Sequence, residues 1–322
     1  MKNKHPHAAV VLVLGLAMAG LHLADLLLWS EADTGFAAAG SVWLRYIPWL
    51  AAFALPYLPA RRAAAQPAGL QDTNKPLGVC MALAGAALLA SGVAAGNTAR
   101  YAILYPEVLS GSCPVWAAWA DLLLPIFAGA WLLNYAVRAF SGFGLQRQRL
   151  GSSLLAGAVP LVFLWRLIWR FQFAPASLCR MPCTLRVLSA AAALLLAVVL
   201  IKIFLVPGLP CGHTLYAAGT GAFLLCTGLE LPQTLFEAAR GMLTLPDLLT
   251  GIGIGLFGLC GLVCAWEACG KETESVSYTH LNRRCTKAAS AFFVREKGFP
   301  LGGSCQRLRP LTDEGRARRY YP

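Results

Sequence analysis

The chain has 322 residues, of which 57% are hydrophobic and only 13% are charged, and its mean hydropathy is +0.59. A soluble domain carries about a quarter charged residues and cannot bury this much apolar surface, so the composition predicts an integral membrane protein. The net charge of +12 does not indicate nucleic-acid binding, because 11 of the 27 Lys and Arg residues lie within residues 271–322 and no basic patch interleaved with aromatic residues precedes them.

Eight segments are apolar enough to cross a bilayer as helices, which takes about 20 residues each. We therefore expect an all-α, polytopic integral membrane bundle of about eight transmembrane helices within residues 1–270. The first segment also resembles a signal peptide, with Lys2 and Lys4 before its apolar run, but the run is long and favours an uncleaved anchor. In chain order the segments are 8–29, 36–58, 77–96, 115–138, 153–172, 186–206, 213–230 and 247–267.

The distribution of Lys and Arg in short loops favours an N-terminus on the inner side of the membrane, since nine of these residues then face inward and six outward. The Ala-, Leu- and Gly-rich segments with short loops suggest a cell membrane, and specifically a bacterial cytoplasmic membrane. The bilayer itself is the first predicted partner.

Ionisable residues within a bilayer are costly and tend to pair inside a helix bundle. With a rise of 1.5 Å per residue, Asp121 and Arg166 both lie about 10 Å from the outer face, on neighbouring antiparallel segments, which predicts an ion pair. Arg45 comes out about 14 Å from that face, and Asp25, with His22 one turn away, lies near it. We expect these four charges to lie in the outer half, where their convergence would form a polar cavity open to the outside.

The stretch LVFLWRLIWRFQF, residues 161–173, contains two arginines that each follow a tryptophan. Arg170 and the aromatic residues around it are typical of a membrane interface. Arg166 lies one turn deeper, and it serves either a structural ion pair or a ligand site. Pro160 predicts a kink, and interrupted helices are typical of transporters. Three other charged residues near the ends of segments are expected to be ordinary boundary residues: Lys202, Glu230 and Glu267.

Glycines recur in two segments at spacings that favour close helix packing. One set repeats every seven residues, and the other forms a G-x-x-x-G pattern; they are Gly78, Gly85 and Gly92, and Gly251 and Gly255. Gly253, Gly255 and Gly258 also satisfy G-x-G-x-x-G. A dinucleotide site needs this motif between a strand and a helix, whereas here it lies inside an apolar span.

The 11 cysteines do not indicate a disulfide scaffold, because several lie within apolar segments as small packing residues, namely Cys80, Cys226, Cys260 and Cys264. A disulfide among Cys113, Cys179 and Cys183 stays open, since these three lie in predicted loops. His213 beside Cys211 is a weak metal signal, and we predict no metal site.

Residues 271–322 are expected to be a polar, basic and disordered tail. Within it the hexapeptide VSYTHL, residues 276–281, can be back-translated as GTC-TCT-TAT-ACA-CAT-CTN. This resembles one reading frame of the transposase recognition end that is used to prepare sequencing libraries. We therefore expect the sequence from about residue 276 to be read through an adapter. The alternative is a native basic tail that touches anionic lipid headgroups.

Three functions are compatible with these features. The first is a permease or transport component that uses the outer-half charges for an anionic or zwitterionic solute. The second is a structural or sensory subunit, whose glycine seams bind other membrane helices and whose charges only stabilise the bundle. The third, a membrane-embedded enzyme, ranks last, because the sequence contains no H-E-x-x-H, G-x-S-x-G or P-loop motif and predicts no catalytic set and no cofactor.

Overall fold

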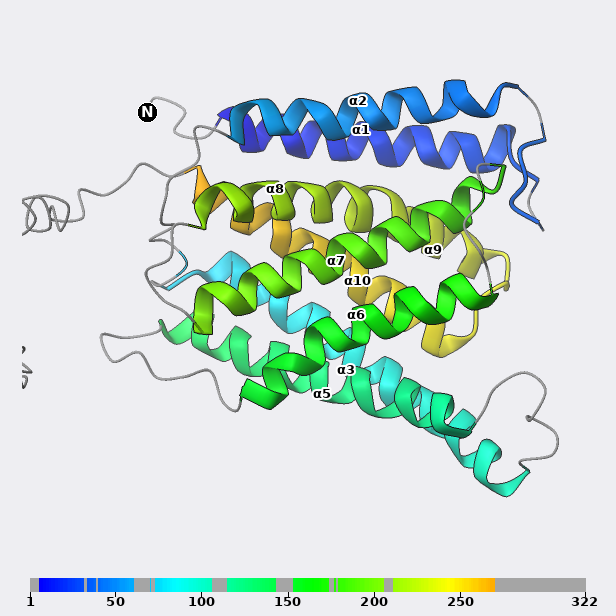
Figure 1. The fold of residues 1–322 in the computed structure, drawn as a ribbon, viewed down its shortest axis with the longest axis vertical. Coiled ribbons are helices and arrows are strands. Elements are labelled where there is room, and N and C mark those ends of the chain that lie inside the picture. Colours follow the sequence, from blue (N-terminus) through cyan, green and yellow to red (C-terminus); the bar gives the residue numbers. More distant parts are fainter. Residues whose placement is uncertain are drawn as a thin grey trace, which may run out of the picture. The chain divides into compact units, whose positions relative to one another are not determined.

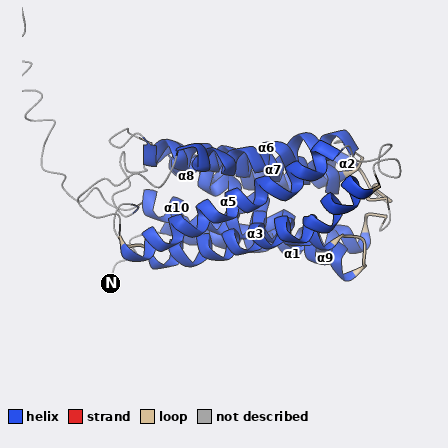
Figure 2. Ribbon diagram, turned by 90° about the horizontal axis from the view of Figure 1, so that it is seen from below, coloured by secondary structure: helices blue, strands red, loops and turns tan. Residues whose placement is uncertain are grey.

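A computed structural model describes residues 6–31, 34–38, 40–60, 70, 73–105, 115–142, 153–173, 177, 179–205 and 211–269. Within these residues no β-strand forms, and the regular elements are helices (Figures 1 and 2). In chain order they are α1 (Pro6–Leu28), α2 (Val42–Ala60), α3 (Lys75–Leu104), α5 (Val115–Ser141), α6 (Ser153–Phe173), α7 (Met181–Leu205), α8 (Gly212–Ala222), the π-helix η2 (Phe223–Glu230), α9 (Leu231–Ala239) and α10 (Leu245–Ala268). The predicted tail, including the hexapeptide 276–281, lies outside the described residues.

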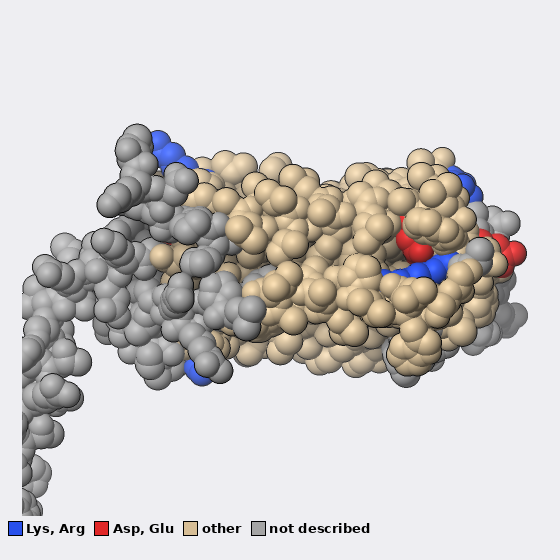
Figure 3. Space-filling model, turned by 90° about the horizontal axis from the view of Figure 1, so that it is seen from above, with Lys and Arg blue, Asp and Glu red and all other residues tan. Residues whose placement is uncertain are grey.

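The predicted all-α membrane bundle is confirmed. Six described helices are long and apolar enough to cross a membrane, and two shorter apolar helices, Val42–Leu55 and Leu154–Trp169, occupy the positions of the second and fifth predicted segments. Leu16, Leu28 and Trp43 are about two-thirds exposed, as expected for side chains that face lipid tails. On the face shown in Figure 3, charged side chains lie near the ends and the middle is uncharged.

Some helices begin or end at other residues than the predicted apolar segments. The second helix begins at Val42 and not at residue 36, because Gly35 and Gly40 have φ angles of +70° and +79° and form a turn before it. The helix predicted as 77–96 continues to Leu104, and the one predicted as 213–230 continues to Ala239. Hydropathy detects the part of a helix that lies in hydrocarbon, and a helix can extend beyond it.

Successive membrane segments alternate in direction, so one end of the bundle collects the end of α1, the start of α2 and the corresponding helix ends after them. We call it the Asp25 end. The location of the Asp25 end on the outer side of a membrane stays a prediction. Laterally, α3 packs along α5 and α10, α6 packs between α5 and α7, and α1 packs against η2 and α9 while α2 packs against α8 (Figure 1).

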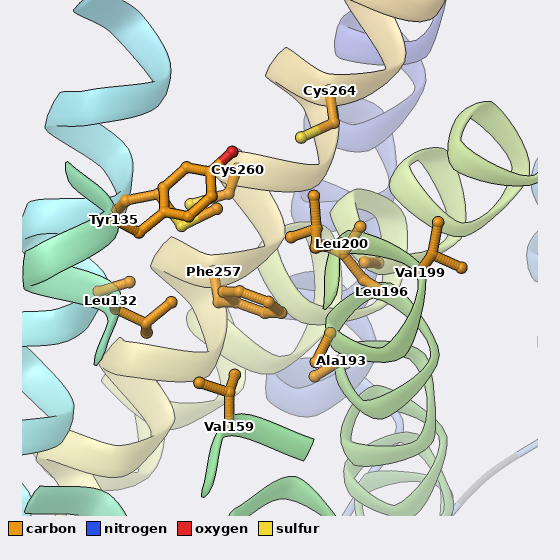
Figure 4. Packing of buried hydrophobic residues seen from close by; sticks show 14 of the residues in the cluster. Leu132, Tyr135, Val159, Ala193, Leu196, Val199, Leu200, Phe257, Cys260 and Cys264 are labelled. Carbon is orange, nitrogen blue, oxygen red and sulfur yellow. The ribbon is translucent and has the colours of Figure 1, made fainter. Parts of the chain in front are cut away.

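The core is apolar and lies where α5, α6, α7 and α10 meet (Figure 4). Leu132 and Tyr135 of α5 and Phe257 of α10 are fully buried there. Of the cysteines predicted to be packing residues, three are fully buried and Cys80 is partly buried; the fully buried ones are Cys226, Cys260 and Cys264.

The glycines of α3 allow it to approach α5 closely. A Cβ atom on Gly85 would lie 2.9 Å from the carbonyl oxygen of Gly129, and one on Gly92 would lie 2.8 Å from that of Leu122. Gly78 lies against an aromatic ring of α5. Any larger side chain at these positions would separate the two backbones.

The glycines of α10 serve the same purpose toward η2 and α9. Gly251 lies against Thr234, and Gly255 lies against Leu231, with added Cβ atoms at 2.5 Å and 2.8 Å from the nearest side-chain atoms. Since α10 is helical throughout this stretch, its G-x-G-x-x-G pattern does not form the strand-to-helix turn of a dinucleotide site. The predicted glycine seams thus lie against neighbours within the same chain.

Candidate functional site

The four charges predicted to lie together are divided into two ion pairs on different helices. Arg45 of α2 pairs with Asp25 of α1, while Arg166 of α6 lies near Asp121 of α5. Since α1 and α2 pack on η2, α8 and α9, whereas α5 packs on α3 and α6, the two groups belong to different sides of the bundle.

Arg166 is buried and has a principal partner that the sequence did not indicate. Its Nη1 donates to Asp247 Oδ1 at 3.1 Å, and its Nη2 donates to Thr250 Oγ1 at 2.9 Å, both on α10. The predicted partner is farther away, with Asp121 Oδ1 at 3.9 Å from Nη2. Asp121 also accepts a hydrogen bond of 2.9 Å from Trp165 Nε1. The prediction of an Asp121–Arg166 pair is therefore correct in part, and Asp247 is the closer carboxylate.

This group continues into α3 and connects three parts of the bundle. The Thr250 hydroxyl lies 2.5 Å from that of Ser91, and Ser91 donates to the carbonyl oxygen of Pro246 at 2.9 Å. Arg166 thereby connects α6 to α10 and, through these hydroxyls, to α3. These hydrogen bonds between helices fit a structural role, although Arg166 Nε is buried and has no hydrogen-bond partner among the described residues. The side chain of Arg170 lies outside those described.

The second ion pair lies closer to the end of the bundle than the sequence predicted. Arg45 Nε is 3.4 Å from Asp25 Oδ1, and Arg45 also donates to the Trp29 carbonyl and to Ser30 Oγ. The predicted depth of about 14 Å for Arg45 is wrong, because α2 begins at Val42 and only three residues precede Arg45 in it. Both side chains are nonetheless buried, at 10% and 6% exposure.

A cavity of about 300 Å³ opens beside this ion pair, between α1 and α2. Asp25 and Arg45 supply its charges, and the rest of its wall is largely apolar, with contributions from Leu21, Leu44, Pro48, Trp29 and Trp49. On the face seen in Figure 3, acidic and basic side chains lie side by side in a hollow near one end. The cavity thus offers one positive and one negative group within an apolar surround.

Behind this cavity lies a buried polar network that the sequence analysis missed. The ring of Trp49, which lines the cavity, packs edge-on against the ring of His22 with centroids 5.9 Å apart. His22 Nε2 lies 3.3 Å from Gln233 Oε1, and the amide nitrogen of Gln233 donates to Glu237 Oε1 at 2.9 Å. Glu237 forms an ion pair with Arg186 of α7.

Glu230 belongs to the same region and corrects a prediction. It was expected to be a boundary residue, but it is 1% exposed and accepts a 2.6 Å hydrogen bond from Ser189 Oγ. The expectation was wrong because the predicted segment ended at residue 230, whereas the helix continues for nine more residues as α9. We define the buried network as His22, Arg186, Ser189, Glu230, Gln233 and Glu237.

The π-helix η2 places Glu230 toward α1 and α7. At its end the Leu231 N–H donates to the Cys226 carbonyl, five residues back. Thr227 Oγ1 donates to the Gly255 carbonyl of α10 at 2.6 Å, which holds the wide turn in place. Pi-helical turns are rare and occur frequently at functional sites. Pro160 lies inside the continuous helix α6, and the kink predicted there stays a prediction.

One sequence signal could have revealed the network. Glu230, Gln233 and Glu237 are spaced i, i+3 and i+7, so they share one helical face if the helix continues beyond residue 230. Hydropathy alone does not reveal this face, because the apolar segment ends before Gln233.

The predictions about the loop cysteines and about metal binding concern other parts of the chain. Cys179 and Cys183 are free thiols, and Cys113 lies outside the described residues. Across the described ranges no three His, Cys, Asp or Glu side chains are grouped as a metal site requires. No protein family, curated protein or solved structure matches the chain.

Proposed function

We propose that the protein is a permease or transport component of a membrane, and that its solute enters the cavity between α1 and α2. The observation that carries the proposal is the buried Asp25–Arg45 ion pair in the wall of that cavity. Ionisable groups within membrane helices are costly and usually mark a solute or ion pathway.

The charges of the cavity favour a small zwitterion. An anionic group of the solute would bind Arg45 and a cationic group would bind Asp25, so each protein charge exchanges one partner for another. Trp29 and Trp49 provide apolar and aromatic surface for the rest of the molecule. A volume of about 300 Å³ is at the lower end of the range for small-molecule pockets and fits a solute the size of an amino acid.

The position of the cavity also supports transport. Asp25 lies three residues before the end of α1, about 5 Å from it along the axis. His22 is about one turn deeper, and the buried network extends from it to α7 and α9. The cavity would therefore be the entrance, with a polar path rather than a purely apolar core behind it.

The structural or sensory alternative is favoured by the Arg166 group, whose hydrogen bonds connect helices of one bundle. Its second element, glycine seams that bind other helices, gains no support, because Gly85 and Gly255 already pack within the chain. The enzyme hypothesis gains no specific observation.

The test is uptake by the purified protein in liposomes. Radiolabelled alanine and glycine betaine are the zwitterionic probes, and acetate and choline represent the single charges. We expect uptake of a zwitterion, and we expect Arg45→Gln and Asp25→Asn each to weaken its half-saturation about tenfold to a hundredfold, as for loss of a charge-assisted contact. Arg240→Gln is the control, since Arg240 is exposed at the same end and stacks on Phe236. The proposal is refuted if the folded wild-type protein transports no zwitterion, or if both cavity variants match the control.

A further inference from the structure

We propose that the buried network binds and releases one proton, held between His22 and Glu230. In the proposed transporter this proton is the coupling ion, a role that rests on the proposed function. The binding of the proton itself does not.

The hydrogen-bond directions within the network determine which nitrogen of His22 is available. The amide nitrogen of Gln233 faces two acceptors, the Pro182 carbonyl at 3.3 Å and Glu237 Oε1 at 2.9 Å. Neither can donate, because Glu237 is ion-paired with Arg186. The Gln233 oxygen must therefore face His22 Nε2, which must donate to it. The remaining nitrogen, Nδ1, then carries a lone pair or a proton.

His22 Nδ1 is buried and has no hydrogen-bond partner among the described residues. The whole side chain is 0% exposed. A buried acceptor without a donor raises the free energy of the folded protein, and Nδ1 is the ring nitrogen to which a proton can be added. Glu230 lies at the end of η2, which packs against α1, the helix that carries His22.

The charges of the network fit the uptake of one proton. Arg186 and Glu237 cancel one another as an ion pair. With His22 neutral and Glu230 ionised, the network carries one negative charge in the interior of a membrane bundle. A single proton on either His22 or Glu230 makes it neutral. Buried sites favour such a balance of charge.

Neighbouring elements carry a few other charged or titratable groups, and the nearest of these already interact with one another. Asp25 and Arg45 are paired, and the Cys226 thiol donates to the Ser189 carbonyl at 3.2 Å. The other titratable or charged side chains on the described helices around the network are Tyr46 and Tyr57 on α2, Cys183 and Lys202 on α7, His213 and Tyr216 on α8, and Asp247, Cys260, Cys264 and Glu267 on α10.

Packing favours a proton over a larger ligand. His22, Ser189, Glu230 and Gln233 are each at most 1% exposed. A proton needs no cavity, and chains of Glu and His are typical of proton paths in membrane transporters. Glu237, whose side chain is 15% exposed, lies nearest the Asp25 end and connects the network to that end through Gln233.

Two reporters on the full chain test the inference. The first is infrared difference spectroscopy of the protein in lipid, from about pH 4 to about pH 9. We expect a titrating carboxylic-acid carbonyl band that Glu230→Gln removes. Glu267→Gln is the matched control, since Glu267 is also in a membrane helix but binds Asn74 outside the network.

The second reporter is His22 itself, and it requires no substitution within the buried network. With His5, His7, His213 and His280 replaced by Asn, His22 is the only histidine, and ¹⁵N spectroscopy reports each ring nitrogen. We expect Nε2 to stay protonated throughout. Uptake of a proton by Nδ1, or by Glu230 in the infrared band, supports the inference. If neither group changes its protonation over this pH range in folded protein, the inference is wrong.

Coupling is measured with whichever zwitterion the wild-type protein transports. Glu230→Gln should abolish accumulation driven by an imposed pH gradient and retain exchange of labelled for unlabelled solute. If the reporters titrate but no solute is transported, the proposed function fails and the proton site stands. If solute is transported and neither reporter titrates, the proton site fails and the proposed function stands.

Discussion

The two carboxylates beside Arg166 should replace one another in part, and this can be measured. Asp247 accepts from Arg166 at 3.1 Å but is 48% exposed, whereas Asp121 lies 3.9 Å away and is 21% exposed. Arg166 itself is 5% exposed. Removal of either carboxylate leaves the guanidinium with the other one, while removal of both leaves a buried charge without a counter-charge among the described residues.

The magnitudes follow from these distances and exposures. A pair of charges 4 Å apart gains about 4 kcal/mol at an effective dielectric constant near 20 and about 1 kcal/mol in water. Because Asp121 and Asp247 are partly solvated and pay a desolvation cost, we expect Asp121→Asn and Asp247→Asn to lower the free energy of unfolding by about 1 kcal/mol each. The double variant should lose about 4 kcal/mol, the usual cost of breaking a buried pair. The excess over additivity is then about 2 kcal/mol.

The assay is reversible unfolding of the purified protein in mixed micelles by SDS, followed by circular dichroism. In an Arg166→Met background the two Asn substitutions should cost less than about 1 kcal/mol together, because no buried charge remains. Strict additivity in the Arg166 protein would contradict this reasoning, and so would a loss for Asp121→Asn alone as large as that of the double variant.

Three further predictions concern packing, the π-helix and topology. Gly129→Ala should destabilise by about 2 kcal/mol, because its Cβ would overlap the α3 backbone, whereas Gly157→Ala, with open space around it, should be neutral or stabilising in the same unfolding assay. Thr227→Val removes the hydrogen bond from η2 to α10 and should lower the free energy of unfolding by about 1 kcal/mol. Thr227→Ser keeps the hydroxyl, so an equal loss in that variant would argue against the contact. Cys179 is exposed at the Asp25 end, so an impermeant maleimide should label it in intact cells if the N-terminus is inside. Labelling only after lysis would indicate the opposite orientation.

Hydropathy and composition were sufficient to predict the class of fold and the number of apolar segments. They also placed Asp121 and Arg166 at matching depth, because the axial position of a residue depends only on the rise per residue and on where the helix ends. Where the helix end was misjudged, the depth was wrong as well, as for Arg45, whose helix begins at Val42.

The tertiary structure decided which helices are neighbours and which faces they present to one another. Arg166 and Asp247 are 81 residues apart in the chain, and no periodicity within either helix specifies that α6 meets α10. Likewise, His22 and Gln233 are 211 residues apart, and Glu230 turns inward through a π-helix held by contacts with α1 and α10. By itself the sequence determined which apolar segments carry charges and, where the helix ends were placed correctly, their positions along the helix axis. Their partners depend on lateral order and rotation about each helix axis, which are set by packing between distant segments.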